Sequence, residues 1–158
     1  HELAELLNVR GDYPQAEEIS RDLLVSVAAE PKIEQVQYEL TLAQSISLQG
    51  YPEEAREILD KVIVVVEEED PALLATVLLH RAGTVLELPT EQTSRQDLDT
   101  SLADLTRSDD LQTELHGSWP TQLSRYWYAV FSLSKQNQME HRTLQTAKKT
   151  KSTKQQNN

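Results

Sequence analysis

The sequence has no cysteine, which excludes disulfide bonds, thiol catalysis and zinc sites built on cysteine. Long apolar runs are also missing. The longest purely aliphatic run, VIVVV at residues 62–66, falls far short of the about 20 residues that cross a bilayer, so we expect no membrane insertion. No secretory signal opens the chain, and we expect an intracellular protein of the cytoplasm or nucleus. Leu3, Ala4 and Leu7 already lie at helical spacing, so we expect the first helix to begin before His1.

Glycine and histidine are too sparse and too scattered for the common catalytic and ligand-binding motifs. The four glycines form no phosphate-binding loop, and there is no nucleophile elbow. The four histidines include no pair at i and i+4 that would bind a metal ion. The carboxylates fall into ordinary surface patterns, such as Glu17 with Arg21. We therefore expect a non-enzymatic protein with no catalytic, cofactor-binding or metal-binding residues, no cofactor and no small-molecule substrate.

Basic residues are in short supply over most of the chain. The net charge is −11, with 8 basic and 25 acidic side chains in residues 1–118 but 7 basic and 1 acidic in residues 119–158. An acidic surface repels the phosphate backbone, so we expect no direct binding of nucleic acid. Plain solubility is the ordinary explanation for such a surface.

The residues that are plentiful favour helices, and prolines divide them into segments. Leucine, alanine, glutamate and glutamine predominate, and these side chains lose little rotamer freedom in a helix. Six prolines separate seven segments, and nearly all carry apolar residues at spacings of three and four. Asp70 before Pro71 indicates an N-cap followed by a first-turn proline. We interpret VIVVV as a buried helix face. The predicted buried stripes are Ile19, Leu23, Leu24 and Val27; Val36, Leu40, Ala43 and Ile46; and Ala55, Ile58, Leu59, Val62 and Ile63.

One phrase occurs twice, as RGDYPQAEEI at residues 10–19 and as QGYPEEAREI at residues 49–58. Gly11 and Gly50 lie 39 residues apart, and each follows a helical run, where a left-handed residue ends a helix well. Aligning these glycines also aligns apolar and small residues on both sides. The matched pairs are Leu3-Ala4 with Leu42-Ala43, Leu7 with Ile46, Ala16 with Ala55, Ile19 with Ile58, Leu23 with Val62 and Leu24 with Ile63.

The repeated unit is therefore a helix, a glycine turn and a second helix. A small alanine lets the two helices approach closely, so we expect Ala16 and Ala55 to be buried where helices cross. We expect the aromatic residue beside the turn, Tyr13 or Tyr51, to pack across it. Packing explains every member of this pattern, and catalysis requires none of them.

These residues resemble the tetratricopeptide repeat family. Its unit has a leucine and a small residue in the first helix, a glycine-aspartate-tyrosine turn, and an alanine early in the second helix. The resemblance implies an all-α fold, an α-solenoid of antiparallel helix pairs with about seven helices. Residues 1–108 would form about three units, the first truncated and the third degenerate, with a period of 39 against the family's roughly 34. The matching residues are Leu3, Ala4, Leu7, Gly11, Asp12, Tyr13 and Ala16, then Leu42, Ala43, Ile46, Gly50, Tyr51 and Ala55.

The same resemblance indicates which residues face a partner. Members that grip the acidic tails of chaperones carry lysines and asparagines on their first helices. The corresponding positions here hold Glu5, Leu40 and Gln44, which lack the positive charge for a carboxylate. We therefore take Glu5 and Gln44 as candidate partner-binding residues, in a groove that prefers a basic or neutral segment.

The segment WPTQLSRYWYAVF, residues 119–131, holds five of the chain's eight aromatic residues. Two interpretations are open. Its apolar side chains pack on the third unit, or its aromatic side chains contact another subunit, since aromatic residues are favoured interface anchors. The candidate core residues are Leu123, Trp127 and Val130, and the candidate interface residues are Tyr126, Tyr128 and Phe131.

The rest of the C-terminal third shows weaker patterns. A narrow leucine stripe predicts a helix over residues 94–108, followed by a loop at residues 109–118 and an aromatic-rich helix at residues 119–144. Residues 145–158 have no large apolar side chain, so we expect a disordered basic tail.

The expected function is that of a non-enzymatic protein–protein interaction scaffold within a subunit of a larger multisubunit assembly. Its partners would be other protein subunits of that complex. The alternative is a peptide- or ligand-sensing regulatory domain of a helical-repeat regulator, which an effector or DNA-binding domain upstream of His1 would favour.

Overall fold

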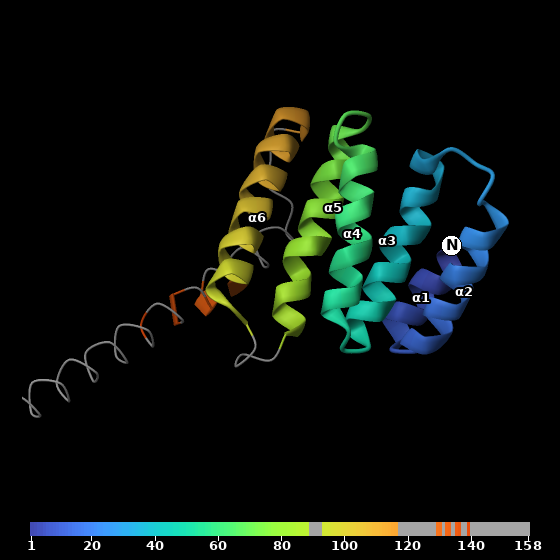
Figure 1. Ribbon diagram of the computed structural model, residues 1–158, viewed down its shortest axis with the longest axis horizontal. Helices are drawn as coiled ribbons and strands as arrows, with labels where there is room; N and C mark the ends of the chain where they lie inside the picture. Colours follow the sequence, from blue (N-terminus) through green and yellow to red (C-terminus); the bar gives the residue numbers. More distant parts are fainter. Residues whose placement is uncertain (89–92, 117–128, 131, 134, 137–138, 140–158) are drawn as a thin grey trace, which may run out of the picture.

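The computed structural model describes residues 1–88, 93–116, 129–130, 132–133, 135–136 and 139, and all regular structure in these residues is helical. The helices pack side by side in chain order, from α1 at one end to α6 at the other (Figure 1). This confirms the predicted all-α solenoid architecture. The elements are α1 (Glu2–Arg10), α2 (Tyr13–Ser26), α3 (Lys32–Leu48), α4 (Pro52–Val66), α5 (Pro71–Thr84), the 3-10 turn η1 (Val85–Glu87) and α6 (Arg95–His116).

The six helices form three antiparallel pairs in two layers. Within the pairs, α1 packs on α2, α3 on α4 and α5 on α6, while α2–α3 and α4–α5 contacts join one pair to the next. The first helices also touch each other, α1 with α3 and α3 with α5. They therefore form one continuous layer, with α2, α4 and α6 in the other. None of the helices in the described part has the length and apolar content needed to cross a membrane.

The turns that follow α1 and α3 have the same backbone geometry. Gly11 and Gly50 have φ values of 85° and 91°, as expected for left-handed C-terminal residues. The amide after each glycine donates to a carbonyl inside the preceding helix, that of Leu7 at 2.9 Å and that of Ile46 at 3.2 Å. The repeated phrase thus encodes a repeated turn. At α5 the predicted cap is confirmed, because an Asp70 carboxylate oxygen accepts from the Leu73 amide at 2.9 Å.

Replacing Gly50 by alanine is expected to lower the free energy of unfolding by about 1–2 kcal/mol, because a Cβ makes the left-handed conformation unfavourable. No atom lies within 4 Å of a Cβ built on Gly50, so backbone strain is the whole cost. Gly50→Asn is the matched control and should lose less, since asparagine tolerates this conformation. Urea denaturation measures both variants, and equal losses would contradict this explanation.

Small residues recur at the helix crossings with the same period as the turns. Ala4, Ala43 and Ala82, each 39 residues from the next, are all fully buried. Ala16 and Ala55 are fully buried as well, as predicted. The correspondence between the first two helix pairs therefore extends into α5, even though α5 ends in the 3-10 turn η1 and not in a glycine turn.

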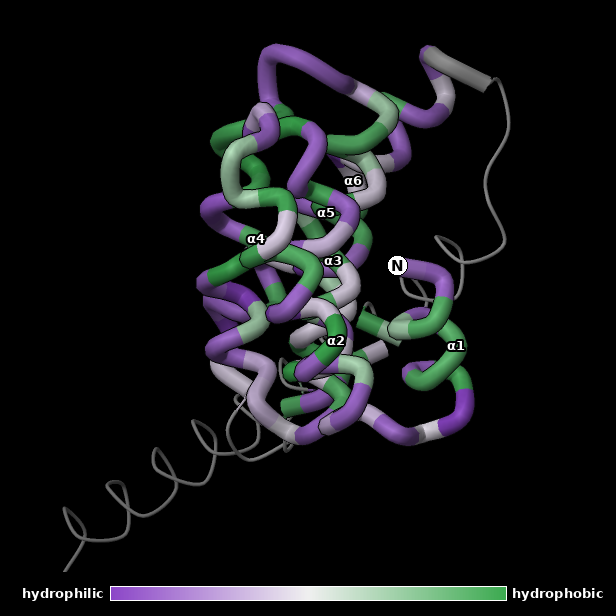
Figure 2. The backbone as a smooth tube through the Cα atoms, turned by 90° about the vertical axis from the view of Figure 1, so that its right-hand side faces the viewer, coloured by the Kyte–Doolittle hydropathy of each residue, from purple (hydrophilic) through white to green (hydrophobic). Residues whose placement is uncertain are grey.

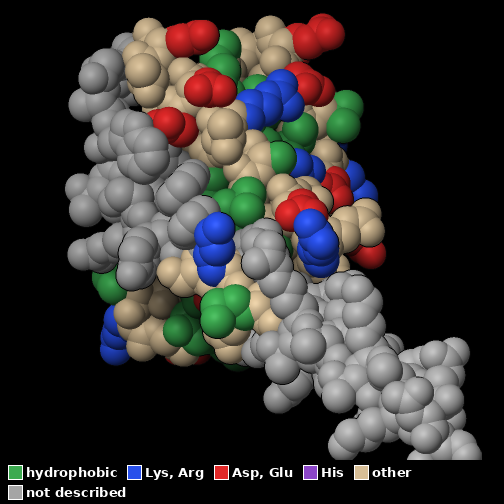
Figure 3. Space-filling view, turned by 90° about the vertical axis from the view of Figure 1, so that its left-hand side faces the viewer, with side chains coloured by type: hydrophobic (Ala, Val, Ile, Leu, Met, Phe, Trp, Pro, Cys, Tyr) green, Lys and Arg blue, Asp and Glu red, His purple; other side chains and the backbone are tan. Residues whose placement is uncertain are grey.

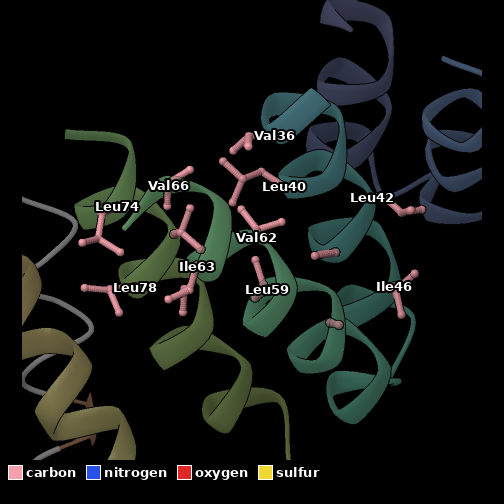
Figure 4. Packing of buried hydrophobic residues seen from close by; sticks show 13 residues of the cluster. Val36, Leu40, Leu42, Ile46, Leu59, Val62, Ile63, Val66, Leu74 and Leu78 are labelled. Carbon is pink, nitrogen blue, oxygen red and sulfur yellow. The ribbon is translucent and has the colours of Figure 1, made fainter. Parts of the chain in front are cut away.

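The main core lies between α3, α4 and α5, where the predicted stripes of α3 and α4 meet (Figure 4). Val62, Ile63 and Val66 point into this core, so these three residues of VIVVV form a buried helix face, as predicted, whereas Val64 points to solvent. A second cluster between α5 and α6 includes Val130, which is fully buried. Its members are Leu79, Ala82, Val85, Leu98, Leu105 and Val130, with Leu86, Leu102 and Leu133 packed against them.

Two predictions about individual segments are wrong. The loop expected at residues 109–118 is helical as far as His116, because Ser108 is buried against α5, where its hydroxyl donates to the Ala75 carbonyl at 2.8 Å. Ser101, Asp104 and Ser108 are buried in this helix beside its leucines, and the apolar spacing continues at Leu111, which packs against the main core. Tyr51 is exposed and does not pack across its turn. The tyrosine follows Gly50 directly but lies two residues after Gly11, so the buried Pro52 occupies the position that corresponds to Tyr13.

Ion pairs link α2, α4 and α6 to one another. Charged side chains of both signs intermix on the face seen from the α6 end (Figure 3). Long side chains bridge these second helices, whereas the first helices touch directly. Arg81 of α5 reaches both neighbouring second helices. The pairs are Arg21–Glu54 at 3.3 Å, Arg56–Asp97 at 2.7 Å, Arg107–Glu67 at 2.8 Å, Arg81–Asp60 at 2.6 Å and Arg81–Asp104 at 2.7 Å.

Candidate binding groove

The first helices enclose a groove of about 290 Å³ on the side of the molecule formed by α1, α3 and α5. Each helix contributes one face, because residues three and four positions apart lie above one another on a helix. The lining residues are His1 and Glu5 at α1; Gln37, Leu40, Thr41 and Gln44 on α3; and Leu73, Thr76 and His80 on α5.

The structure brings together the three groove residues that the sequence predicted. Glu5, Leu40 and Gln44 all line this groove, on two neighbouring first helices. The other candidate residues, Tyr126, Tyr128 and Phe131, lie outside the described residues, as do Leu123, Trp127 and the tail at residues 145–158.

Several lining residues were not predicted from the sequence. Extending the 39-residue internal alignment beyond the glycine turns identifies some of them. Glu5 and Gln44 lie 39 residues apart. The same interval relates Gln37 to Thr76 and Thr41 to His80, and all of these residues line the groove. The groove therefore repeats with the helix pairs, and extending the alignment beyond the glycine turn was the available signal.

The electrostatics of the groove are neutral to weakly negative. Its lining includes no lysine or arginine, and its one carboxylate, Glu5, is half-exposed with an oxygen 3.2 Å from the His1 Nε2 atom. Burial lowers the pKa of His80, so its imidazole is neutral at pH 7 and adds no positive charge. An acidic ligand would find no lysine or arginine among these residues.

A smaller hollow of about 60 Å³ continues the groove towards η1, and it shares Gln44 and His80 with the larger one. Ser47 lines it, and the Ser47 hydroxyl oxygen is buried with no hydrogen-bond partner in the part of the chain that the structure describes. A buried hydroxyl without a partner is costly. This end of the groove therefore presents a hydrogen-bonding group that a bound molecule would satisfy.

Amides, hydroxyls and two leucines make this surface suitable for binding. Gln37 and Gln44 each present a carbonyl acceptor and two N–H donors. Leu40 and Leu73 supply apolar area beside them. Over the described ranges, no three His, Asp or Glu side chains are grouped so as to hold a metal ion.

No protein-family model, curated protein or solved structure matches this chain. Its function is therefore inferred from the groove and the side chains that line it.

Proposed function

We propose that this protein is a non-enzymatic interaction scaffold of the tetratricopeptide repeat type that binds an extended segment of a protein partner in the α1–α3–α5 groove. The observation that carries this proposal is the row of hydrogen-bonding side chains along three successive first helices, which includes one carboxylate, Glu5, and no lysine or arginine. A segment bound there would belong to another subunit of a larger assembly.

The spacing of two glutamines supports an extended peptide as the ligand. Gln37 and Gln44 lie two turns apart on α3, a rise of about 10 Å at ~1.5 Å per residue. An extended peptide advances about 3.3 Å per residue, so this interval spans about three peptide residues. Each amide side chain can both donate to and accept from the peptide backbone. The two glutamines would therefore fix the path of the peptide with little regard to its sequence.

Sequence preference would come from the remaining lining residues. Leu40 and Leu73 favour an aliphatic side chain between the two amide contacts. Glu5 favours a lysine or arginine on the α1 side of the groove, and the absence of lysine and arginine from the lining disfavours acidic segments. The expected partner segment is neutral or basic, with at least one aliphatic residue.

Screening the full chain against immobilised basic, neutral and acidic peptide sets tests this function. Basic and neutral peptides should bind, and Gln37→Ala with Gln44→Ala should weaken the best peptide about tenfold or more, because each lost hydrogen bond contributes about 0.5–1.5 kcal/mol. Glu5→Lys should shift the preference towards neutral and acidic peptides.

The matched control is Gln15→Ala with Gln96→Ala, which removes two exposed glutamines from α2 and α6, away from the groove. These changes should leave peptide affinity unaltered. Acidic peptides binding best, or equal losses in the groove and control variants, would contradict the proposal.

A further inference from the structure

The outward side of α1 carries an apolar surface that no described residue covers. Leu3, Leu6 and Val9 are 57%, 53% and 85% exposed, and their spacing of three keeps them on one side of the helix. We call these three residues the α1 outer face. Figure 2, which looks at the α1–α2 end, shows α1 mainly in hydrophobic colours. The opposite side of α1, with Ala4 and Leu7, is buried.

The corresponding residues of α3 show what normally covers such a face. Leu42, Ser45 and Leu48 lie 39 residues after Leu3, Leu6 and Val9. Leu42 is 4% exposed, Ser45 is fully buried and Leu48 is half-buried.

The covering comes from the preceding helix pair. Helix α2 packs along α3, and the Ser45 hydroxyl donates to Asn8 Oδ1 of α1 at 3.0 Å. The two faces therefore occupy equivalent positions in successive helix pairs. The α1 outer face differs because no helix pair in the described part of the chain packs against it as α1 and α2 pack against α3.

A charge lies beside this surface at another equivalent position. At the C-terminal cap of α3, the Gln49 amide donates to a Glu17 carboxylate oxygen of α2 at 2.6 Å. Arg10 is the residue 39 positions before Gln49, and its exposed guanidinium has no hydrogen bond or ion pair with any described group. A helix packed on α1 as α2 packs on α3 would place the equivalent of Glu17 near Arg10.

We propose that the α1 outer face and Arg10 form a docking surface for an additional helix pair of the α1–α2 kind. The second helix of that pair is amphipathic and carries a carboxylate opposite Arg10. A second copy of this chain fits less well. The nine residues of α1 offer far less area than the about 800 Å² per partner of a typical stable interface. At the other end of the array, Val130 and Leu133 already cover the α5–α6 cluster.

The test is a fusion protein in which a copy of residues 1–39 directly precedes His1 of the full chain. The copied Glu39 then precedes His1 as Glu39 precedes Leu40, so the copied α2 is in register to pack on α1. Leu6→Asp should lower the midpoint of thermal unfolding by less than about 1 °C in the parent protein, where Leu6 is exposed. In the fusion protein the same change should lower it by about 5 °C or more, because the carboxylate would be buried.

A charge exchange tests the predicted pairing. Arg10→Glu should lower the midpoint of the fusion protein, and adding Glu17→Lys in the copied segment should restore it. Val64→Asp, on a similarly exposed valine of α4, is the control and should act equally in the parent and the fusion protein. These readouts measure folding and involve no peptide, so they are independent of the groove proposal.

Two outcomes would overturn the inference. One is that Leu6→Asp has the same effect in both proteins, with the copied segment unfolding in a separate transition. The other is that the parent sediments as a dimer that Leu6→Asp dissociates, which would assign the surface to a second copy of the chain.

Discussion

Replacing Arg81 by leucine is expected to lower the free energy of unfolding by about 3–5 kcal/mol. Arg81 donates to both carboxylate oxygens of Asp104 at 2.8 and 2.7 Å, and to Asp60 at 2.6 Å. These bonds, chiefly those to Asp104, raise the pKa of Arg81, so the guanidinium stays charged throughout the pH range of the folded protein. The Asp104 side chain is only 7% exposed, so the substitution leaves a buried carboxylate without compensation.

Urea denaturation measures this loss, and two further variants isolate its cause. Arg21→Leu removes an arginine whose ion pairs are largely exposed, and it should cost less than about 1 kcal/mol. Adding Asp104→Leu to Arg81→Leu should recover part of the loss, because the uncompensated charge is then gone. Equal losses for the Arg81 and Arg21 variants would show that the buried pair does not stabilise the α5–α6 interface.

Leucine in place of Ala16 or Ala55 is expected to lower the free energy of unfolding by about 1–3 kcal/mol at each position. Both alanines are fully buried where two helices cross, so three additional carbon atoms must push the helices apart. Ala103→Leu is the matched control, since Ala103 is exposed on α6 and has room for a larger side chain. An unchanged unfolding midpoint for both buried positions would contradict the assigned helix register.

The sequence predicts the helices well wherever large apolar residues follow helical spacing. In α3 and α4 the predicted residues are buried, apart from the half-buried Ile58, because they meet in the main core between α3, α4 and α5. In α2 all four predicted residues, Ile19, Leu23, Leu24 and Val27, are only half-buried. The glycine turns are predictable for a local reason, since few other residues accept their backbone conformation.

The parts that escape prediction depend on contacts between distant residues. Asp104 and Ser108 are buried in α6 because Arg81 and the Ala75 carbonyl on α5 bond to them. A polar residue carries no apolar signal, and its partner cannot be recognised from the sequence alone. The groove shows the same limit. Glu5 and Gln44 follow from the resemblance to a repeat family, whereas Leu73 is identified only once α5 is placed beside α3.

Partners could contact this protein through the groove or through the aromatic segment, residues 119–131. Burial of Val130 confirms that this residue packs on the third helix pair. The roles of Tyr126, Tyr128 and Phe131 stay predictions, because these residues lie outside the described part of the chain. Binding through the groove and binding through these aromatic residues predict different contact surfaces for the same partner.

Nuclear magnetic resonance of the full chain, titrated with the tightest peptide from the screen, separates these surfaces. We predict that the side-chain amide signals of Gln37 and Gln44 shift most, together with backbone signals of the groove faces of α1, α3 and α5. Signals from α2, α4 and α6 should move little. The largest shifts falling on those second helices, or on residues 119–131 with the two glutamines unmoved, would contradict peptide binding in the groove.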